Sequence, residues 1–371
     1  MPAPTADRRR ICLLMWRDTD HPDGGGSEVY VEHMARWLAA RGHDVTVVCA
    51  AHAAAPADEL RDGVRFRRRG GRLTVYLHGL AYLLGRGRRT DVVVDVANGV
   101  PFFTPLVRRR GLRTLVHHVH REQWQIIFPG LRGSIGWWIE SRVAPVVYRR
   151  VPYMTVSEAS RADLGRLGVA PERIRIVHNG IDVPHPSALR ARSATPRVCV
   201  LGRLVPHKQV EHALETVASL RHAIPDLRLD VVGDGWWSAP LRDAAERAGV
   251  DDLVTFHGHV SDRERDALLD SAWLLLVPSV KEGWGIVIME AAARGVPALA
   301  YAHAGGVTEA IVDGETGVLV ADRPALTAET ARLLTDTEAR LAMGKAARER
   351  AQDFGWTASC AAFERWVLQG E

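Results

Sequence analysis

The sequence VPSVKEGWGIVIMEAAARG at residues Val277–Gly295 decides the fold. It opens with the end of an apolar run, continues through a loop containing Gly283 and Gly285, and ends in an apolar helical segment. A buried strand, a glycine-containing loop and a helix in this order are typical of α/β proteins with parallel sheets. The start of such a helix exposes backbone N–H groups and the positive end of the helix dipole, and glycines let a ligand approach the backbone. This stretch therefore predicts an anion-binding site suited to phosphate.

Two carboxylates flank the predicted anion site. Glu282 lies in the loop and Glu290 on the helix, with seven residues between them. Because phosphate repels a carboxylate, we expect both side chains to contact a hydroxyl group or a developing positive charge. The alternative is that Glu282 is a solvated loop residue and Glu290 an exposed helix residue. The apolar neighbours of Glu290 favour a functional role.

Strand and helix patterns alternate on both sides of this stretch. In the second half we expect strands at 198–201, 227–232, 254–258, 273–277 and 298–300, and helices at 210–222, 239–248, 262–271 and 286–294. In the first half we expect strands at 11–16 and 44–49, a helix at 27–41, and further apolar runs at 91–94, 114–119, 153–157 and 174–178. This alternation predicts parallel sheets with helices on both faces and ligands beyond the carboxyl ends of the strands.

The domain boundaries follow from a break in this alternation. Residues 184–196 hold three prolines and little periodicity, which is typical of a linker. We therefore predict an N-terminal Rossmann-like domain at 1–183, a linker at 184–195 and a C-terminal Rossmann-like domain at 196–371. The two doubly wound domains are expected to face a central cleft. Residues 354–371, which contain four aromatic side chains, are expected to cross back to the first domain.

The composition excludes several classes of protein. The chain has 371 residues, 47% hydrophobic and 25% charged, as in an ordinary soluble protein of two domains. No run approaches the roughly 18 apolar residues that cross a bilayer. The apolar segment after Arg8–Arg10 is too short for a signal sequence, so we expect a cytoplasmic protein. The four cysteines show no C-x-x-C spacing, which indicates neither a disulfide framework nor a zinc site.

Charge is distributed unevenly along the chain. Residues 1–187 contain 28 arginines, no lysine and 18 acidic residues, a net charge of +10, whereas the remainder carries −6. Arginine-rich patches at 65–72, 86–89 and 108–113 are expected in loops. Such patches suggest nucleic-acid binding, but no nucleic-acid-binding motif accompanies them, so we expect no nucleic-acid partner. The segment 135–150 mixes aromatic and apolar residues with arginines and predicts either a helix on an anionic membrane or a packed helix with a basic edge.

The central stretch resembles the E-x7-E signature of the retaining glycosyltransferases of family 4, which have the GT-B fold. Residues 202–208 resemble that family's G-R-x-x-x-x-K, and residues 232–235 its glycine turn. Residues 177–182, 305–309 and 314–317 are similar to its V-x-N-G-I-D, G-G-x-x-E and T-G elements. The resemblance covers nearly the whole chain and is densest across 196–320. Trp284 stands where the family usually has phenylalanine, and Thr308 where it usually has proline.

The resemblance implies that the domain at 196–371 binds the nucleotide sugar and that the domain at 1–183 binds the acceptor. Glu290 would accept hydrogen bonds from the ribose hydroxyls, and Glu282 would bind hydroxyls of the donor sugar. Arg203 and Lys208 would neutralise the diphosphate, with the arginine as a bidentate fork and the lysine as a point charge. A pair of surface cations is the alternative for Arg203 and Lys208.

Backbone groups would complete that donor site. By the same resemblance, the amides of Gly285, Ile286 and Val287 would bind the diphosphate, and the loop ending at Val260 would hold the base. Asp234 follows the glycine turn and is a further candidate, with a plain turn residue as the alternative.

The first half carries weaker signals. The resemblance places a glycine pair, Gly25 and Gly26, against the donor phosphate and sugar. It also implies one histidine at the end of a strand, which hydrogen-bonds the donor sugar. His117 fits that position, with Glu122 as the accompanying glutamate, but a shift of register would select His118 or His120. On a strand, His118 and His120 would share one face and His117 the other.

Two further candidates, Ser157 and Asn179, follow later strands. Ser157 belongs to a V-S element resembling that of the family, although a helix N-cap explains a serine there equally well. Asn179 lies in the segment that resembles V-x-N-G-I-D. The H-x-H spacing of the histidines could also indicate a metal pair, but a third ligand is not evident, so we predict no metal.

Taken as implied by the resemblance, the protein is a retaining hexosyltransferase with His117, Glu282, Arg203 and Lys208 in the catalytic centre. The donor is expected to be a UDP- or GDP-type nucleotide sugar, and the acceptor a small molecule, natural product or lipid. A nucleotide-sugar epimerase or phosphorylase of the same fold is one alternative. A non-catalytic protein that binds nucleotide sugars or a membrane surface is another.

Overall fold

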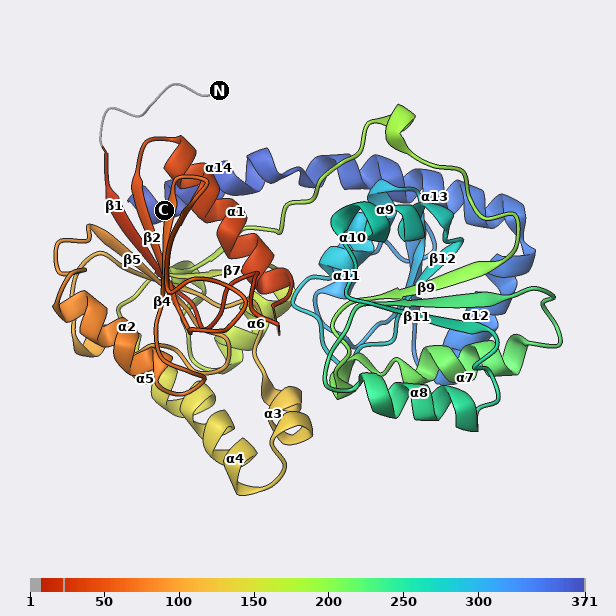
Figure 1. The fold of residues 1–371 in the computed structure, drawn as a ribbon, viewed down its shortest axis with the longest axis horizontal. Coiled ribbons are helices and arrows are strands. Elements are labelled where there is room, and N and C mark those ends of the chain that lie inside the picture. Colours follow the sequence, from red (N-terminus) through yellow and green to blue (C-terminus); the bar gives the residue numbers. More distant parts are fainter. Residues whose placement is uncertain (1–7, 23, 370–371) are drawn as a thin grey trace. The chain divides into compact units, whose positions relative to one another are not determined.

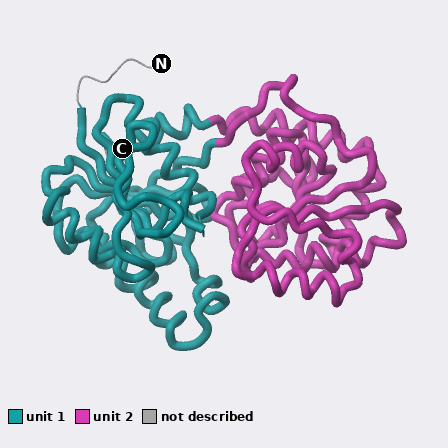
Figure 2. The backbone as a smooth tube through the Cα atoms, viewed as in Figure 1, with its two compact units in different colours: residues 1–180, 356–371 teal, residues 181–355 magenta. Residues whose placement is uncertain are grey.

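The computed structural model describes residues 8–22 and 24–369. The chain forms two compact units (Figure 2). Unit 1 contains the chain up to Gly180 and again from Trp356 onwards, and unit 2 contains Ile181–Gly355.

Unit 1 is built on an eight-stranded sheet with the order β3-β4-β2-β1-β5-β6-β7-β8. All of its pairings are parallel except the antiparallel pair β3–β4. Its strands are β1 (Arg10–Leu14), β2 (Asp44–Cys49), β3 (Asp58–Arg61), β4 (Val64–Arg68), β5 (Val92–Val96), β6 (Leu112–Leu115), β7 (Tyr153–Thr155) and β8 (Ile174–Ile176). Its helices are α1 (Gly26–Ala40), α2 (Val75–Leu84), α3 (Arg121–Ile127), α4 (Leu131–Trp138), α5 (Ala144–Val147), α6 (Glu158–Arg166) and α14 (Trp356–Gln369).

Unit 2 is built on a six-stranded, fully parallel sheet with the order β11-β10-β9-β12-β13-β14. Its strands are β9 (Arg197–Leu201), β10 (Arg228–Val232), β11 (Val254–Gly258), β12 (Leu274–Val277), β13 (Ala298–Tyr301) and β14 (Gly317–Val320). Its helices are α7 (Glu211–Leu220), α8 (Ser238–Arg247), α9 (Asp262–Ser271), α10 (Ile286–Ala293), α11 (Val307–Ala310), α12 (Arg323–Thr335) and α13 (Thr337–Ala351). Helices α7 and α8 cover one face of this sheet, and α9 and α10 the other (Figure 1).

Mainly apolar sequences explain why β5 and β12 are central strands. All five residues of β5 and all four of β12 are buried, because helices cover both faces of each sheet. Burying one valine or leucine side chain contributes about 1.5–3 kcal/mol to folding. In both sheets the strand order reverses beside the first strand, β1 or β9, and ligands of α/β sheets bind at such switch points.

Three parts of the fold differ from the sequence-based expectation. The arginine patch at 65–72 was expected in a loop, but Arg65–Arg68 lie on β4, where Val64, Phe66 and Arg68 are buried in alternation. Residues 184–195, predicted as a linker, lie within unit 2: Arg192 donates to the carbonyls of Leu269, Asp270 and Arg294. The segment 135–150 is not one regular helix, since a π-helical turn at Ile139–Val143 separates α4 from α5.

The C-terminal helix α14 belongs to unit 1. It packs along α1, where the ring of His33 stacks on that of Trp356 with centroids 3.9 Å apart. Glu364 of α14 accepts a hydrogen bond from Trp37 Nε1 at 3.0 Å and pairs with Arg41 at 3.3 Å. Across the part of the chain that the structure describes, no helix has the length and apolar character needed to cross a membrane.

Candidate functional site

The loops at the carboxyl edge of the unit 2 sheet are bound to one another through their backbones. The Gly202 N–H donates to the Val232 carbonyl, and the Leu204 N–H to the Asp234 carbonyl, at 3.0 and 2.9 Å. A Cβ added to Gly233 would lie 2.0 Å from the carbonyl oxygen of Gly202, so only glycine fits there. The glycine turn predicted from the sequence therefore serves close packing between the loops after β9 and β10.

Lys208 and Glu282 form an ion pair at this edge. The Lys208 ammonium, in the 3₁₀ turn after β9, lies 2.6 Å from Glu282 Oε1, and Ser279 Oγ donates to the same oxygen at 2.6 Å. The exposed fractions of the two charged side chains are 24% and 12%. The Val280 N–H donates to the His207 carbonyl at 2.9 Å and joins the two loops. The carboxylate of Glu282 is thus fixed from two sides.

A pocket opens beside this ion pair. It is formed by the ends of β9 and β12 and the loops that follow them. Its polar lining comes from Arg203, Lys208, Ser279 and Glu282. The structure therefore brings together three residues that the sequence analysis assigned to one donor site, and adds Ser279.

Helix α10 begins next to this pocket with no side-chain cap. Its N-cap, Gly285, has φ +95° and ψ +57°, a left-handed conformation that favours glycine. The first turn of the helix contains Ile286 and Val287, whose N–H groups have no earlier carbonyl of the same helix to bind. Trp284 is 1% exposed, with its ring 5.1 Å from that of Phe354. The buried indole anchors the loop that leads to this uncapped helix start.

Glu290, on the same helix, is paired with a residue that the sequence analysis did not single out. Its Oε1 lies 3.4 Å from Arg265 Nη1 of α9, and its side chain is 23% exposed. Burial raises the pKa of Glu290 to about 7 against the pull of Arg265, and the nearby carboxylates of Asp266, Asp262 and Asp182 raise it further. A carboxyl with this pKa changes charge near neutral pH.

The two remaining candidates of unit 2 differ in character. Asp234 accepts hydrogen bonds from the Gly235 N–H at 2.7 Å and from Ser238 Oγ at 2.6 Å, and these bonds lower its pKa. Its geometry is that of a turn residue at the start of α8. Val260 is half-buried in the short loop between Gly258, which ends β11, and Ser261, which caps α9.

In unit 1, the predicted glycine pair starts α1. Gly25 is the N-cap, and its N–H donates to Glu28 Oε2 at 2.8 Å. Gly26 is the first residue of the helix. Glu28 is fully buried and pairs with Arg17 at 3.1 Å. The glycine pair is therefore held by a buried ion pair that the sequence did not reveal.

The structure separates the three histidines. Strand β6 ends at Leu115, so they follow the strand rather than lie on it. His118 Nε2 lies 3.0 Å from Gln123 Oε1, and its ring lies 4.2 Å from that of His120. His120 Nδ1 lies 3.0 Å from Glu140 Oε1. Both of these rings are thus occupied in local contacts.

His117 lies apart from the other two histidines. It is 6% exposed, packs edge-on against Tyr30 at 5.3 Å, and its Nε2 has no hydrogen-bond partner among the described residues. Burial lowers its pKa to about 4, opposed by Glu28 and aided by His120. The imidazole is therefore neutral at physiological pH. Glu122, the glutamate paired with His117 by resemblance, is exposed in the first turn of α3.

Ser157 and Asn179 are both buried. Ser157 caps α6 by accepting a hydrogen bond from the Ser160 N–H at 3.0 Å, which supports the helix-cap interpretation. Asn179 is 3% exposed, and its Oδ1 has no hydrogen-bond partner among the described residues.

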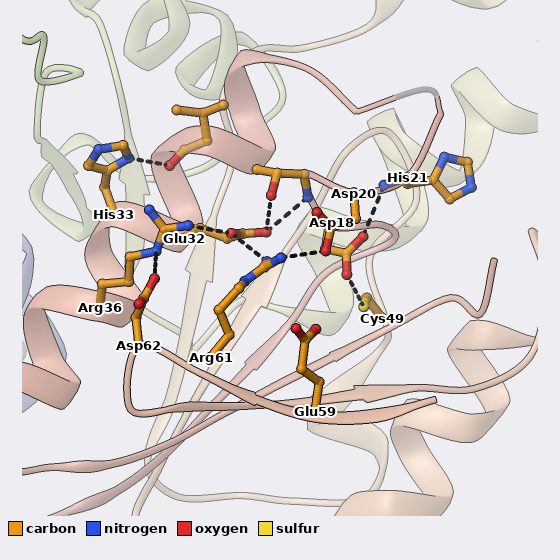
Figure 3. A network of polar contacts seen from close by, with 12 residues as sticks. Asp18, Asp20, His21, Glu32, His33, Arg36, Cys49, Glu59, Arg61 and Asp62 are labelled. Carbon is orange, nitrogen blue, oxygen red and sulfur yellow. Dashed lines mark hydrogen bonds and ion pairs between the residues drawn. The ribbon is translucent and has the colours of Figure 1, made fainter. Parts of the chain in front are cut away.

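A network of charged side chains occupies the carboxyl edge near β1 (Figure 3). Glu32 of α1 accepts hydrogen bonds from the backbone and hydroxyl of Thr19 at 2.9 and 2.8 Å and pairs with Arg61 at 3.0 Å. Arg61 also pairs with Asp20. Fully buried Asp18 pairs with Arg68, one of the arginines of the patch at 65–72. These arginines stabilise the loop after β1.

Comparison with known proteins decides the family. The model for Glycosyltransferase Family 4 matches residues 24–185, and the model for Glycosyl transferases group 1 matches residues 185–350. Side by side they cover both units. The chain belongs to glycosyltransferase family 4.

Individual relatives agree with this assignment. Glycogen synthase of Mycobacterium tuberculosis is 28% identical over 390 residues, covering 94% of this chain and 91% of the relative. Sucrose-phosphate synthase from Thermosynechococcus elongatus has a TM-score of 0.82 at 23% identity, covering 98% of this chain and 99% of that one. HepE of Anabaena, solved in complex with UDP-glucose, has a TM-score of 0.77 at 19% identity, covering 97% and 99%. The fold of this glycosyltransferase is GT-B.

Sequence reasoning missed the partners that hold the site of the glycosyltransferase in place. Ser279 positions Glu282, Arg265 pairs with Glu290, and Glu140 holds His120. The i,i+3 spacing of Asp262 and Arg265 was visible, but it indicates only a helix-surface pair. Within the described residues, no group of three or more His, Cys, Asp and Glu side chains is placed to hold a metal ion.

Proposed function

We propose that the protein is a retaining hexosyltransferase that moves a sugar from a UDP- or GDP-type donor to a small-molecule, natural-product or lipid acceptor. The observation that carries this proposal is the ion pair of Lys208 and Glu282, set beside Arg203 and the uncapped start of α10. The structure of HepE with UDP-glucose supports a UDP sugar as donor. Membership of family 4 supports retention of the anomeric configuration.

The proposed chemistry depends on charge that grows on the leaving diphosphate. Positive charge beside the leaving diphosphate comes from Arg203, Lys208 and the N-terminus of α10. It stabilises the negative charge that develops as the bond between the anomeric carbon and the phosphate oxygen breaks. Because these groups are fixed in one sheet edge, little reorganisation is needed during the reaction. We propose that they take the place of a metal ion, and that the leaving phosphate itself receives the acceptor proton.

The carboxylates have separate roles in this proposal. Glu282 accepts hydrogen bonds from hydroxyls of the donor sugar, and Glu290 from those of the ribose. When the diphosphate binds Lys208, the ion pair between Lys208 and Glu282 weakens. The carboxylate of Glu282 can then accept hydrogen bonds from the sugar. In unit 1, the neutral imidazole of His117 offers one hydrogen bond to a sugar hydroxyl without adding charge.

A donor screen tests this function. Thermal unfolding of the full chain is measured with UDP-, GDP- and dTDP-sugars and with the free nucleotide diphosphates. A ligand that binds only the folded state raises the melting temperature. At a ligand concentration of 100 times its dissociation constant, the free energy of unfolding increases by about 2.7 kcal/mol. We expect one base to stabilise the protein clearly. If no nucleotide sugar or nucleotide diphosphate shifts the melting temperature, the proposal is wrong.

The stabilising donor is then incubated with candidate acceptors. Transfer predicts release of the nucleoside diphosphate that depends on the acceptor, and an α-linked product from an α-linked donor by NMR. Conversion of the donor sugar to its epimer without any acceptor would instead show an epimerase of the same fold.

A further inference from the structure

Unit 1 contains an open pocket whose lining includes none of the candidate site residues discussed above. It lies at the amino ends of β7 and β8 and encloses about 1080 Å³ of empty space, including the solvent at its mouth. The residues of the predicted site, His117, Ser157 and Asn179, follow the carboxyl ends of β6, β7 and β8. The pocket is therefore at the opposite end of the same strands.

The lining of this pocket is strongly basic. Five arginines and one glutamate contribute to it, and the rest is apolar or proline. The arginines are Arg149, Arg150, Arg161, Arg173 and Arg175, and the glutamate is Glu172. A net charge of this size around one hollow attracts anions and repels cations.

Most of this charge is not neutralised by the protein. The guanidinium groups of Arg149, Arg150 and Arg175 form no hydrogen bond or ion pair with any residue in the described parts of the chain. All three residues are exposed. Arg161 pairs only with Glu158, at 3.2 Å, and the side chain of Glu158 is 63% exposed, so that pair is weak. Three guanidinium forks are thus available to a ligand.

The pocket is also held in shape before any ligand binds. Arg173 Nη2 donates to the carbonyls of Tyr148 and Val151, at 2.5 and 2.6 Å, and so fixes the turn that carries Arg149 and Arg150. One wall is Trp366 of α14, which is 1% exposed. Its carbonyl accepts a hydrogen bond from Arg113 Nε at 3.0 Å. Because the turn is already fixed, binding need not order the backbone that carries Arg149 and Arg150.

We propose that this arginine pocket binds a phosphate-bearing ligand. Guanidinium groups match phosphate oxygens with paired, charge-assisted hydrogen bonds, and three unpaired forks suit two or more phosphate groups or one dianion. The phosphate belongs either to a soluble phosphorylated compound or to the headgroup of an anionic lipid. The pocket is separate from the proposed donor site, because none of its lining residues is among those assigned to donor binding.

Calorimetric titration with inorganic pyrophosphate tests the pocket. The triple variant Arg149→Ala/Arg150→Ala/Arg175→Ala is compared with Arg86→Ala/Arg88→Ala/Arg89→Ala, which removes the same charge from exposed arginines elsewhere in unit 1. Both are made in an Arg203→Ala/Lys208→Ala background, so that the donor site does not contribute. We expect the pocket variant to weaken binding by about 100-fold or more and the control by less than about threefold. Equal losses of affinity in the pocket variant and the control would overturn the proposal. If the triple variant unfolds, the single variant Arg175→Glu replaces it in the same titration and should also weaken pyrophosphate binding.

Vesicle sedimentation separates the two sources of phosphate. Phosphatidylcholine vesicles with and without phosphatidic acid are mixed with the parent protein and the two triple variants. Binding that needs phosphatidic acid and is lost only in the pocket variant assigns the site to a lipid headgroup. Pyrophosphate binding without vesicle binding assigns it to a soluble compound. Absence of both contradicts the proposal.

Discussion

Glu282 is held by two donors that converge on one oxygen, Lys208 Nζ and Ser279 Oγ. The pair is partly buried, so its members interact more strongly than a surface pair, and removing one partner leaves the other charge uncompensated. Position and charge at the proposed reacting centre therefore depend on Lys208, Ser279 and Glu282 together.

Substitutions at Glu282 test this arrangement. We expect Glu282→Gln to lower kcat by about 100-fold or more, because a neutral amide keeps the shape but loses the charge that orients the sugar. Ser279→Ala removes one hydrogen bond to a carboxylate and should cost about tenfold in kcat/KM. Steady-state kinetics with the donor from the screen gives both values. Glu349→Gln, an exposed carboxylate paired with Lys345, is the control and should be unchanged. Equal activity of Glu282→Gln and the control would contradict the role of Glu282.

The pKa of Glu290, raised to about 7, predicts opposite effects of pH on stability and on function. The ordinary pKa of a glutamate, which applies to the unfolded chain, is 4.5. Between pH 4.5 and 7 the folded protein therefore holds a proton on Glu290 that the unfolded chain has lost. The contribution of protonated Glu290 to the free energy of unfolding is complete below pH 4.5 and is lost as the pH rises through 7. The loss is at most about 3 kcal/mol. Glu290→Gln should therefore raise the melting temperature relative to wild type more at pH 8 than at pH 5.

Activity should follow the charged form of Glu290. Because the ionised carboxylate is the better acceptor for ribose hydroxyls, we expect kcat/KM for the donor to fall as the pH falls below about 7. Glu290→Gln should have a lower kcat/KM without that decline. A variant that keeps the decline would show that another group titrates.

At the scale of elements, the loops after β12 and β13 are joined as closely as those after β9 and β10. The Glu282 N–H donates to the Ala304 carbonyl at 2.7 Å, and the Gly306 N–H returns to the Glu282 carbonyl at 3.1 Å. A Cβ on Gly306 would lie 2.1 Å from the Gly283 carbonyl oxygen. The backbone of Glu282 is therefore positioned by the loop after β13.

Gly306→Ala tests this contact cleanly. The backbone of Gly306 has φ −62° and ψ −8°, which any residue adopts, so only lack of space opposes the added methyl group. We expect a loss of about 1–3 kcal/mol in unfolding free energy and a reduced kcat. Gly355→Ala, where nothing lies within 4 Å of the added Cβ, is the control and should be neutral. Urea denaturation measures both, and equal stability of the two variants would show that the loops separate readily.

The sequence predicted the strands and helices of unit 2 up to β13 closely, because each is a short, mainly apolar run or a helix between clear end signals. Helix α9, Asp262–Ser271, has the bounds expected. The hairpin β3–β4 was not predicted, since its arginines hide the alternation of Val64, Phe66 and Arg68. Arg68 is buried there because Asp18 and Asp20 come to it from a distant loop.

The site was predicted as far as its motifs extend. Lys208 and Glu282 were both singled out, but their direct contact depends on the order of β9 and β12 in the sheet, which sequence spacing does not contain. Ser279 and Arg265 have no motif of their own. Likewise, His117 differs from His118 and His120 only in its surroundings, through Tyr30 and burial.

At the scale of the molecule, the uneven charge has two structural explanations. Part of the arginine excess of the first half is neutralised inside unit 1: Arg17 by Glu28, and Arg61 by Glu32. Another part of this positive charge lies in the arginine pocket, where the protein does not neutralise it. The second half is net acidic, so its proposed donor site relies on a few placed groups, namely Arg203, Lys208 and the start of α10, rather than on net charge.

Calorimetric titration of the full chain with the donor's nucleoside diphosphate tests the central claim most directly. The double variant Arg203→Ala/Lys208→Ala is compared with Arg247→Ala/Lys345→Ala, which removes the same charges from exposed positions of unit 2. Two charge-assisted contacts to a diphosphate predict a loss of about 100-fold or more in affinity for the first variant and no change for the second. Equal affinity of both variants and wild type would contradict the assignment of this sheet edge as the donor site.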